Sequence, residues 1–213
     1  MKRREFTLSV GVAGASALLA LPVRAQSEPV EGKDYTRLQT PVPVAVPGKI
    51  EVVEFFGYWC PHCNAFEPAL EAWVAKLPAS VNFRRIPVVF NATHEPYQKL
   101  YFALEALGLV ATVHGKVFNA LHVQRKRLEK DADISAFAAA NGLDGAKLID
   151  TMKSFSVATK GNQAKQMAQN FRIDGVPTLA IQGRYLTSIT QAGSGERALQ
   201  VTDALIRKAR AAG

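Results

Sequence analysis

The chemistry of this chain is most readily assigned to two cysteines that lie three positions apart. The sequence contains only these two, Cys60 and Cys63, and Pro61 and His62 stand between them. A disulfide between such close neighbours closes almost no loop, so it would stabilise the fold very little. The pair is better suited to cycle between a dithiol and a disulfide, which indicates thiol–disulfide exchange.

A metal site is the main alternative for the cysteine pair. A structural zinc ion takes four protein ligands, and the chain has no second pair of cysteines. His94, His114 and His122 could complete such a site only from a different part of the chain. Their spacing shows no evident partners, so we interpret them as structural or surface residues and predict neither a metal nor a cofactor.

The cysteine pair lies where a strand-like run gives way to a helix. Residues 50–56 are rich in β-branched and aromatic side chains, as strands are. Beyond the pair, apolar residues recur at helical spacing: Phe66, Leu70, Trp73, Val74 and Leu77. Cys60 therefore begins a helix, where unpaired N–H groups and the positive end of the helix dipole favour a thiolate. We expect Cys60 to be the exposed nucleophile, Cys63 the resolving thiol one turn inside, and His62 a group that stabilises the thiolate.

Two motifs in this sequence resemble those of the DsbA family of thiol oxidases. The first consists of EFF at 54–56, CPHC at 60–63 and FE at 66–67. The second, GVPT at 175–178, resembles the cis-proline loop of thioredoxin-fold proteins, which in that family packs against the active-site disulfide. The two motifs, their order and their separation cover essentially the whole mature chain.

The resemblance implies roles for particular residues. It assigns catalysis to Cys60, Cys63, His62, Pro177 and Glu54, and substrate binding to Val176, Thr178 and Pro61. Glu54 matches a buried acid beneath the disulfide that assists proton transfer, whereas by its strand position alone it could face solvent. Arg85 on the next expected strand could be its charge partner, and Glu67 occupies another matching acidic position.

The two motifs are separated by much more chain than a bare thioredoxin fold needs. Residues 81–90 are expected to form the next strand, and roughly 85 residues then lead to the cis-proline loop, far beyond an ordinary connection. Helical patterns in this stretch cover 97–107, 113–122, 134–140, 146–157 and 164–171, with breaks near Gly108, Asn141-Gly142 and Gly161. Strands near 178–181 and 184–188 and a helix over about 195–210 are expected to close the chain.

We therefore predict an α/β protein: a thioredoxin fold, with a central mixed sheet flanked by helices and an inserted all-helical domain. The expected division begins with a cleaved signal peptide at 1–25 and the first part of the thioredoxin fold at 26–94. The helical insertion is expected at 95–165 and the second part of the thioredoxin fold at 166–213.

The N-terminal segment has the three parts of an export signal. It begins with Lys2, Arg3 and Arg4, and the apolar run at 10–21 is too short for a stable membrane anchor. Small residues then stand at the signal-peptidase positions of 23–25. The arginine pair also fits a twin-arginine signal, so the export route stays open. Both routes lead to the periplasm, without stable insertion in the membrane.

The charge pattern does not indicate a nucleic-acid partner. The formal net charge is +8, but no block of lysine and arginine with interleaved aromatic residues is present. The densest group, at 125–127, is followed by Glu129 and is interpreted as a solvated helix face.

The resemblance implies a protein thiol oxidase that passes its disulfide to exported proteins as they fold. It also implies a membrane protein similar to DsbB, coupled to quinone, as the reoxidant. A periplasmic disulfide reductase or isomerase on the same fold is the alternative, because the direction of electron flow depends on potential and partner.

Overall fold

The computed structural model describes residues 28–212. The predicted signal peptide, 1–25, lies outside these residues. No helix in the described part of the chain is long and apolar enough to cross a membrane.

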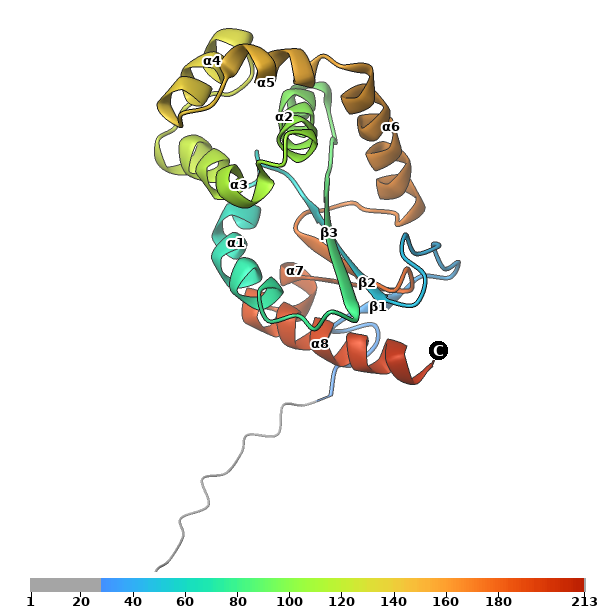
Figure 1. Ribbon diagram of the computed structural model, residues 1–213. Helices are drawn as coiled ribbons and strands as arrows, with labels where there is room; N and C mark the ends of the chain where they lie inside the picture. Colours follow the sequence, from blue (N-terminus) through green and yellow to red (C-terminus); the bar gives the residue numbers. More distant parts are fainter. Residues whose placement is uncertain (1–27, 213) are drawn as a thin grey trace, which may run out of the picture.

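A five-stranded mixed sheet forms the centre of the molecule (Figure 1). Its strands are β1 (Thr36–Arg37), β2 (Ile50–Phe56), β3 (Val81–Pro87), β4 (Thr178–Ile181) and β5 (Tyr185–Ser188). Their order across the sheet is β1-β5-β4-β2-β3, with β2 parallel to β3 and antiparallel to β4. Because β2 is central and covered on both faces, nearly all of its residues are buried.

Two helices outside the insertion pack on one face of the sheet. They are α1 (Pro61–Val74) and α8 (Gly195–Ala211), and the short α7 (Ile189–Ala192) precedes α8. Leu70 of α1 and Val201 of α8 share one apolar cluster with Val52 of β2. On the opposite face, Val53 and Phe55 of β2 belong to a second cluster that continues into the helical segment. The alternation of β2 therefore sends Glu54 to the same face as Val52, toward α1.

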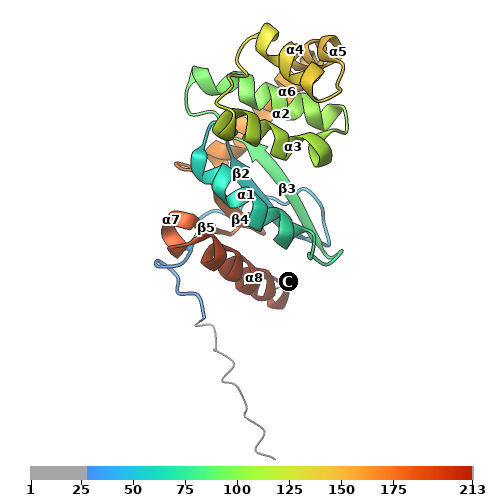
Figure 2. The ribbon, with the colours of Figure 1, turned by 90° about the vertical axis from the view of Figure 1, so that its left-hand side faces the viewer.

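The chain between β3 and β4 is helical. It contains η1 (Ala92–His94), α2 (Glu95–Ala106), α3 (Val110–Phe118), the π-helix η2 (Asn119–Val123), α4 (Asp131–Ala140), α5 (Gly145–Met152) and α6 (Phe155–Asn170). Figure 2 shows helices α2 to α6 gathered at one end of the molecule, with α8 at the other. This is the predicted arrangement of elements, although α6 runs through residue 165, so the proposed domain limits at 95 and 165 stay predictions.

One predicted helix break is wrong and two agree with the structure. Gly108 and Gly142 have φ angles of 69° and 68° and lie just beyond helix ends. Gly161 lies instead inside α6, which begins after Ser154, whose hydroxyl accepts a hydrogen bond from the N–H of Val157. A Cβ at Gly161 would approach Oε1 of Gln98 in α2 to 2.9 Å. Glycine at this position therefore allows α2 and α6 to pack closely rather than ending a helix.

The strand expected at 81–90 is shorter than predicted. β3 ends at Pro87, opposite Phe56, because Phe56 is the last residue of its partner β2; the N–H of Val88 makes one more bond, to the Phe56 carbonyl. The chain then turns at Asn91, whose side chain accepts a hydrogen bond from the N–H of Thr93.

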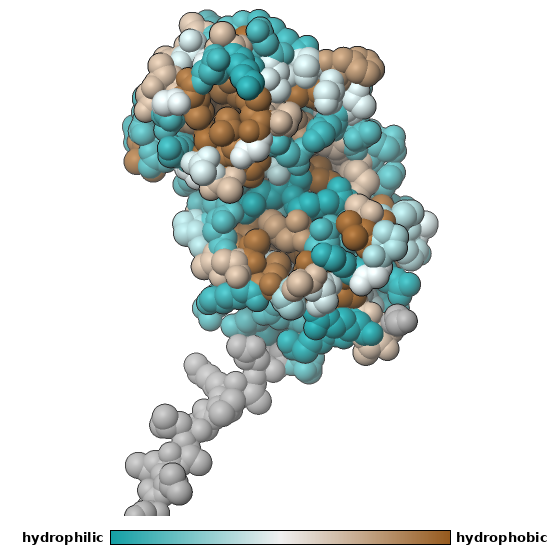
Figure 3. Space-filling view, viewed as in Figure 1, coloured by the Kyte–Doolittle hydropathy of each residue, from teal (hydrophilic) through white to brown (hydrophobic). Residues whose placement is uncertain are grey.

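The face of the molecule seen in Figure 3 carries two apolar patches with a hydrophilic band between them. One patch lies over the helical segment and the other is a hollow lower on the molecule. The upper end of β2 in Figure 1 leads into α1, the helix that begins at the cysteine pair.

Candidate active site

Cys60 is the N-cap residue of α1, as the sequence predicts. Its backbone is extended, and Pro61 occupies the first helical turn, where its missing N–H removes no helical hydrogen bond. The Cys60 N–H donates to the carbonyl of Gly57, and its own carbonyl accepts from the N–H of Asn64. These bonds fix the Cys60 side chain at the N-terminal end of the helix.

The cis-proline loop lies directly against Cys60. The bond between Val176 and Pro177 is cis, and Sγ of Cys60 lies 3.4 Å from the carbonyl oxygen of Val176, to which it donates when it is protonated. Thr178 begins β4, and its hydroxyl donates to the Gly175 carbonyl at 2.8 Å, which holds the loop closed. The two motifs, separated by 116 residues in the sequence, therefore meet at the sulfur.

The expectation of an exposed Cys60 is wrong for this dithiol form of the protein. Only 4% of Cys60 is accessible to solvent, compared with 1% of Cys63. The cis-proline loop covers Cys60, whereas the neighbouring Pro61 and His62 are exposed.

The two cysteines hold their protons with very different strength. The hydrogen bond from Cys63, together with the backbone N–H groups of Cys63 and His62 and the charge of His62, lowers the pKa of Cys60 to about 6. Burial and the hydrogen bond to Cys60 raise the pKa of Cys63 far above its usual range. Cys60 is therefore the thiolate and Cys63 the protonated thiol at neutral pH.

A buried cluster of charges lies between β2, β3 and α1. Arg85 donates through Nε to Glu54 at 3.0 Å and through Nη2 to Glu67 at 2.9 Å. The same Nη2 lies 2.6 Å from Glu71, whose side chain is 57% exposed. Strand register brings the pair together, because Glu54 stands directly opposite Arg85 in the parallel ladder. The predicted ion pair of Glu54 and Arg85 is therefore present, and Glu67 joins it.

The carboxyl of Glu54 is almost inaccessible, at 1% exposure. Burial raises its pKa to about 8, and the charge of Arg85 only partly opposes this rise. Glu67 is also buried, which alone would raise its pKa, but His114 and Arg85 hold it below its ordinary value. The charge of Glu54 contributes to the raised pKa of Cys63, so the acid and the resolving thiol interact electrostatically.

Three histidines hold the segment that precedes Cys60. The spacing of these histidines in the sequence did not reveal their partners. His114 Nδ1 lies 2.7 Å from the hydroxyl of Tyr58, and His122 Nε2 lies 2.7 Å from the Tyr58 carbonyl. His94 stacks on the ring of Trp59, with centroids 3.8 Å apart. Tyr58 is 56 residues from His114 and 64 residues from His122 in the sequence, so only the tertiary structure brings them together.

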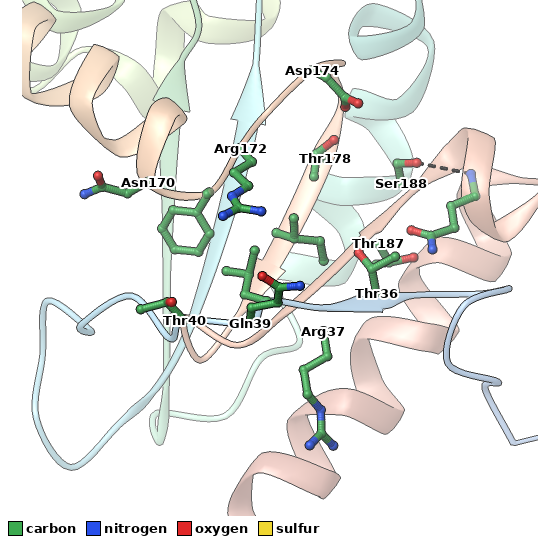
Figure 4. Close-up of a pocket in the computed structure, with 14 residues that line it drawn as sticks. Thr36, Arg37, Gln39, Thr40, Asn170, Arg172, Asp174, Thr178, Thr187 and Ser188 are labelled. Carbon is green, nitrogen blue, oxygen red and sulfur yellow. Dashed lines mark hydrogen bonds between the residues drawn. The ribbon is translucent and has the colours of Figure 1, made fainter.

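A groove runs from the active site along the cis-proline loop. Its first part has a volume of about 490 Å³ and lies between His62, residues 174–178 and residues 188–191. It adjoins a second hollow of about 510 Å³, and the two share the lining residues Asp174, Thr178, Ser188 and Gln191. Figure 4 shows this second hollow, with Arg172 pointing into it and Arg37 pointing away.

No group of three or more histidine, cysteine or acidic side chains in residues 28–212 is arranged to hold a metal ion. The candidate site is thus built from cysteine thiols, one buried acid–base cluster and a groove beside the proline loop. A thioredoxin-type sheet with a CxxC pair at the N-terminus of a helix defines a thiol:disulfide oxidoreductase.

Comparisons with known proteins agree with this class. A model of the DSBA-like thioredoxin domain matches residues 85–205, and the thioredoxin model matches residues 42–98. The chain is 42% identical to the thiol:disulfide interchange protein DsbA of Pseudomonas syringae pv. tomato, over 98% of this chain and 97% of the relative. It is 41% identical to the DsbA of Bordetella pertussis, over 99% and 100% of the two chains. The chain belongs to the DSBA-like thioredoxin family.

Solved structures lead to the same assignment. The crystal structure of Pseudomonas aeruginosa DsbA superposes with a TM-score of 0.83 at 42% identity, covering 86% of this chain and 95% of that one. The oxidoreductase DsbA from Xylella fastidiosa gives a TM-score of 0.80 at 32% identity, over 87% and 100% of the two chains. The predicted family, fold class and thiol:disulfide oxidoreductase activity are therefore confirmed, and thiol oxidation is the role typical of this family.

Proposed function

We propose that this protein oxidises exported proteins in the periplasm by passing its Cys60–Cys63 disulfide to them. The observation that carries this proposal is the position of Cys60 at the N-terminus of α1, where Cys63 and backbone N–H groups lower its pKa, one turn from the buried Cys63, whose pKa is raised. A stabilised Cys60 thiolate favours the reduced form of the enzyme, which makes its disulfide a strong oxidant.

The exchange proceeds in two steps that pass two electrons from substrate to enzyme. A substrate thiolate attacks the Cys60 sulfur, the bond between Cys60 and Cys63 breaks, and Cys63 leaves with the electron pair. A second substrate thiolate then attacks the substrate sulfur of the mixed disulfide and expels Cys60 as a thiolate. The products are an oxidised substrate and the enzyme dithiol.

In this scheme Glu54 supplies a proton to Cys63 as Cys63 leaves. Because the pKa of Cys63 is raised, the leaving thiolate must be protonated, and Glu54 with a pKa of about 8 carries a proton at neutral pH. His62 stabilises the Cys60 thiolate through its charge and its backbone N–H. Pro61 opens the helix, and Val176, Pro177 and Thr178 form the loop along which the substrate chain would lie.

The proposed reoxidant is a quinone-linked membrane protein similar to DsbB. Each turnover leaves a dithiol, and the two cysteines are the only ones in the chain, so the electrons must pass to another molecule. Membranes depleted of quinone should reoxidise the enzyme more slowly than intact membranes. Equal rates would contradict this choice of reoxidant, and recovery of the protein outside the periplasmic fraction would contradict the location.

The direction of electron flow is tested by the redox equilibrium of the purified mature protein with glutathione. Trp59 is adjacent to Cys60, so its fluorescence can report the reaction. A potential near −120 mV, roughly that of DsbA, is the expected result, whereas thioredoxin lies near about −270 mV. A value near the thioredoxin end would contradict the oxidase and favour the reductase alternative.

A further inference from the structure

His114 is a buried titratable residue of α3 that the exchange steps above do not use. It is 4% exposed, and its ring packs against the aromatic rings of Phe56 and Phe118. The titratable groups that face it are Tyr58 from the β2–α1 loop, Glu67 from α1 and Tyr101 from α2.

Both ring nitrogens of His114 lie against titratable groups. Nδ1 is 2.7 Å from the Tyr58 hydroxyl, and Nε2 is 3.3 Å from Oε1 of Glu67, without the alignment of a full hydrogen bond. An ionised Glu67 can only accept, so Nε2 carries a hydrogen in both charge states of the ring. The Tyr58 hydroxyl can donate to a neutral Nδ1 or accept from a protonated one. The site therefore accommodates a neutral or a charged His114.

The charges of the cluster require one proton among its members. Two buried carboxylates, Glu54 and Glu67, share one buried cation, Arg85, while Glu71 is largely exposed. A buried negative charge without a partner is costly, so the excess charge is neutralised by protonation. Besides Glu67, the groups that can hold this proton are Glu54, next to Arg85, and His114, next to Glu67.

Three buried polar atoms of the cluster have no hydrogen-bond partner within residues 28–212: Glu54 Oε1, Glu67 Oε2 and His114 Nε2. These atoms lie on both sides of Arg85, one on Glu54 and two on Glu67 and His114. Such an arrangement suits a cluster that can hold its proton on either side of Arg85. We propose that His114 is a positioning residue that shares the proton of the buried cluster with Glu54, and so sets the pH at which Glu54 can protonate Cys63. This inference rests on the role proposed above for Glu54.

If Glu54 and His114 share one proton, replacing His114 must change the pH at which Glu54 loses it. In one arrangement Glu54 is protonated and His114 neutral, and in the other Glu54 is ionised and His114 charged. A His114→Gln change keeps a polar side chain but removes the second arrangement. The proton is then confined to the carboxylates, and Glu54 keeps it up to a higher pH.

The kinetic test follows the reaction of the oxidised protein with reduced glutathione across the pH range. Dividing the rates of the unaltered protein and of each histidine variant by the rate of Glu54→Gln cancels the titration of glutathione and isolates the part of the rate that depends on Glu54. For His114→Gln, the pH at which the Glu54-dependent part of the rate is lost should rise by about half a unit or more. His122→Gln is the matched control, since His122 contacts the Tyr58 carbonyl and not the charge cluster. It should leave the midpoint unchanged.

A second measurement reads the sharing without catalysis. The ring nitrogens of His114 are titrated by NMR in the unaltered protein and in Glu54→Gln. Removing the negative charge of Glu54 makes a charged His114 less favourable, so the His114 midpoint should move to lower pH. An unchanged midpoint would overturn the proposal even if His114→Gln failed to fold. The two proposals can also fail separately. If the His114 midpoint changes but the reaction with glutathione does not depend on Glu54, the proton is shared as proposed. The catalytic role of Glu54, and with it the effect of His114 on Cys63, would then be refuted.

Discussion

At the scale of single residues, one helical turn separates two thiols with opposite properties. Cys60 has a lowered pKa because it accepts hydrogen bonds at the helix N-terminus, and Cys63 has a raised pKa because it is buried. The asymmetry gives each sulfur one role: Cys60 forms the mixed disulfide, and Cys63 is released or attacks in return. The same asymmetry has a consequence for stability.

The reduced protein should become more stable relative to a Cys60→Ser variant as pH rises from about 6 toward 9. The folded-state pKa of Cys60 is lowered from 9.0 to about 6, so its contribution is fully present above the unfolded value. The contribution is lost as pH falls through the folded value. Urea unfolding of both proteins under reducing conditions measures this difference. A difference that stays constant across that range would show that the Cys60 thiolate is not stabilised by folding.

At the scale of elements, the active site lies where three parts of the chain meet. The N-terminus of α1 presents Cys60, the cis-proline loop before β4 covers it, and the turn between β5 and α7 completes the groove. Ser188 caps α7 by accepting from the N–H of Gln191, which fixes the groove wall (Figure 4). We expect this groove to receive the substrate chain next to the reacting cysteine.

Filling the groove should slow the oxidation of protein substrates more than the reaction with small thiols. Thr190 is exposed and lines the groove, so a Thr190→Arg change would obstruct an extended chain. The rate of oxidation of a reduced, unfolded protein should fall severalfold, while the equilibrium with glutathione stays the same. Thr112→Arg is the matched control, because Thr112 is exposed on α3 away from the groove. Equal rates for both variants would show that substrates dock elsewhere.

At the scale of the whole molecule, the buried cluster connects the sheet to the helical segment. Arg85 comes from β3, Glu54 from β2, Glu67 from α1, and His114 reaches them from α3. His114 and His122 also bond Tyr58, so α3 and the helix that follows it contact the residues just before Cys60. The helical segment is thereby positioned to influence the active-site chemistry.

Removing the cation of this cluster should destabilise the protein strongly at neutral and alkaline pH. Arg85→Met leaves Glu54 and Glu67 buried without their partner, a change that costs about 3 to 5 kcal/mol. The pKa values of both carboxyls would rise, so the loss should be greater at pH about 8 than near their ordinary value of 4.5.

Denaturant unfolding at the two pH values measures this dependence. Arg85→Lys keeps the charge but not the forked geometry, and it should lose less stability than Arg85→Met. Equal losses for the two variants at both pH values would show that packing of the side chain, rather than its charge, is what stabilises the cluster.

The sequence by itself determined the chemistry and most elements, because these depend on local pattern, and it determined the fold class through the resemblance of its two motifs to those of a known family. The CPHC segment, the strand before it and the helix after it lie within a few residues of one another, so spacing alone indicates a reactive thiol at a helix N-terminus. The sequence also offered Arg85 as a charge partner for Glu54, because the two stand on neighbouring predicted strands, and the strand register sets them opposite each other.

Only the tertiary structure decided how far each side chain is buried and which distant groups face one another. The cover over Cys60 comes from Val176, 116 residues away, so the local pattern could not show that the sulfur is buried. His114 and His122 both bond Tyr58, from which α1, β3, η1 and α2 separate them in the sequence, at distances along the chain that no periodicity encodes. Gly161 was misassigned for the same reason, since its role depends on Gln98 in a different helix.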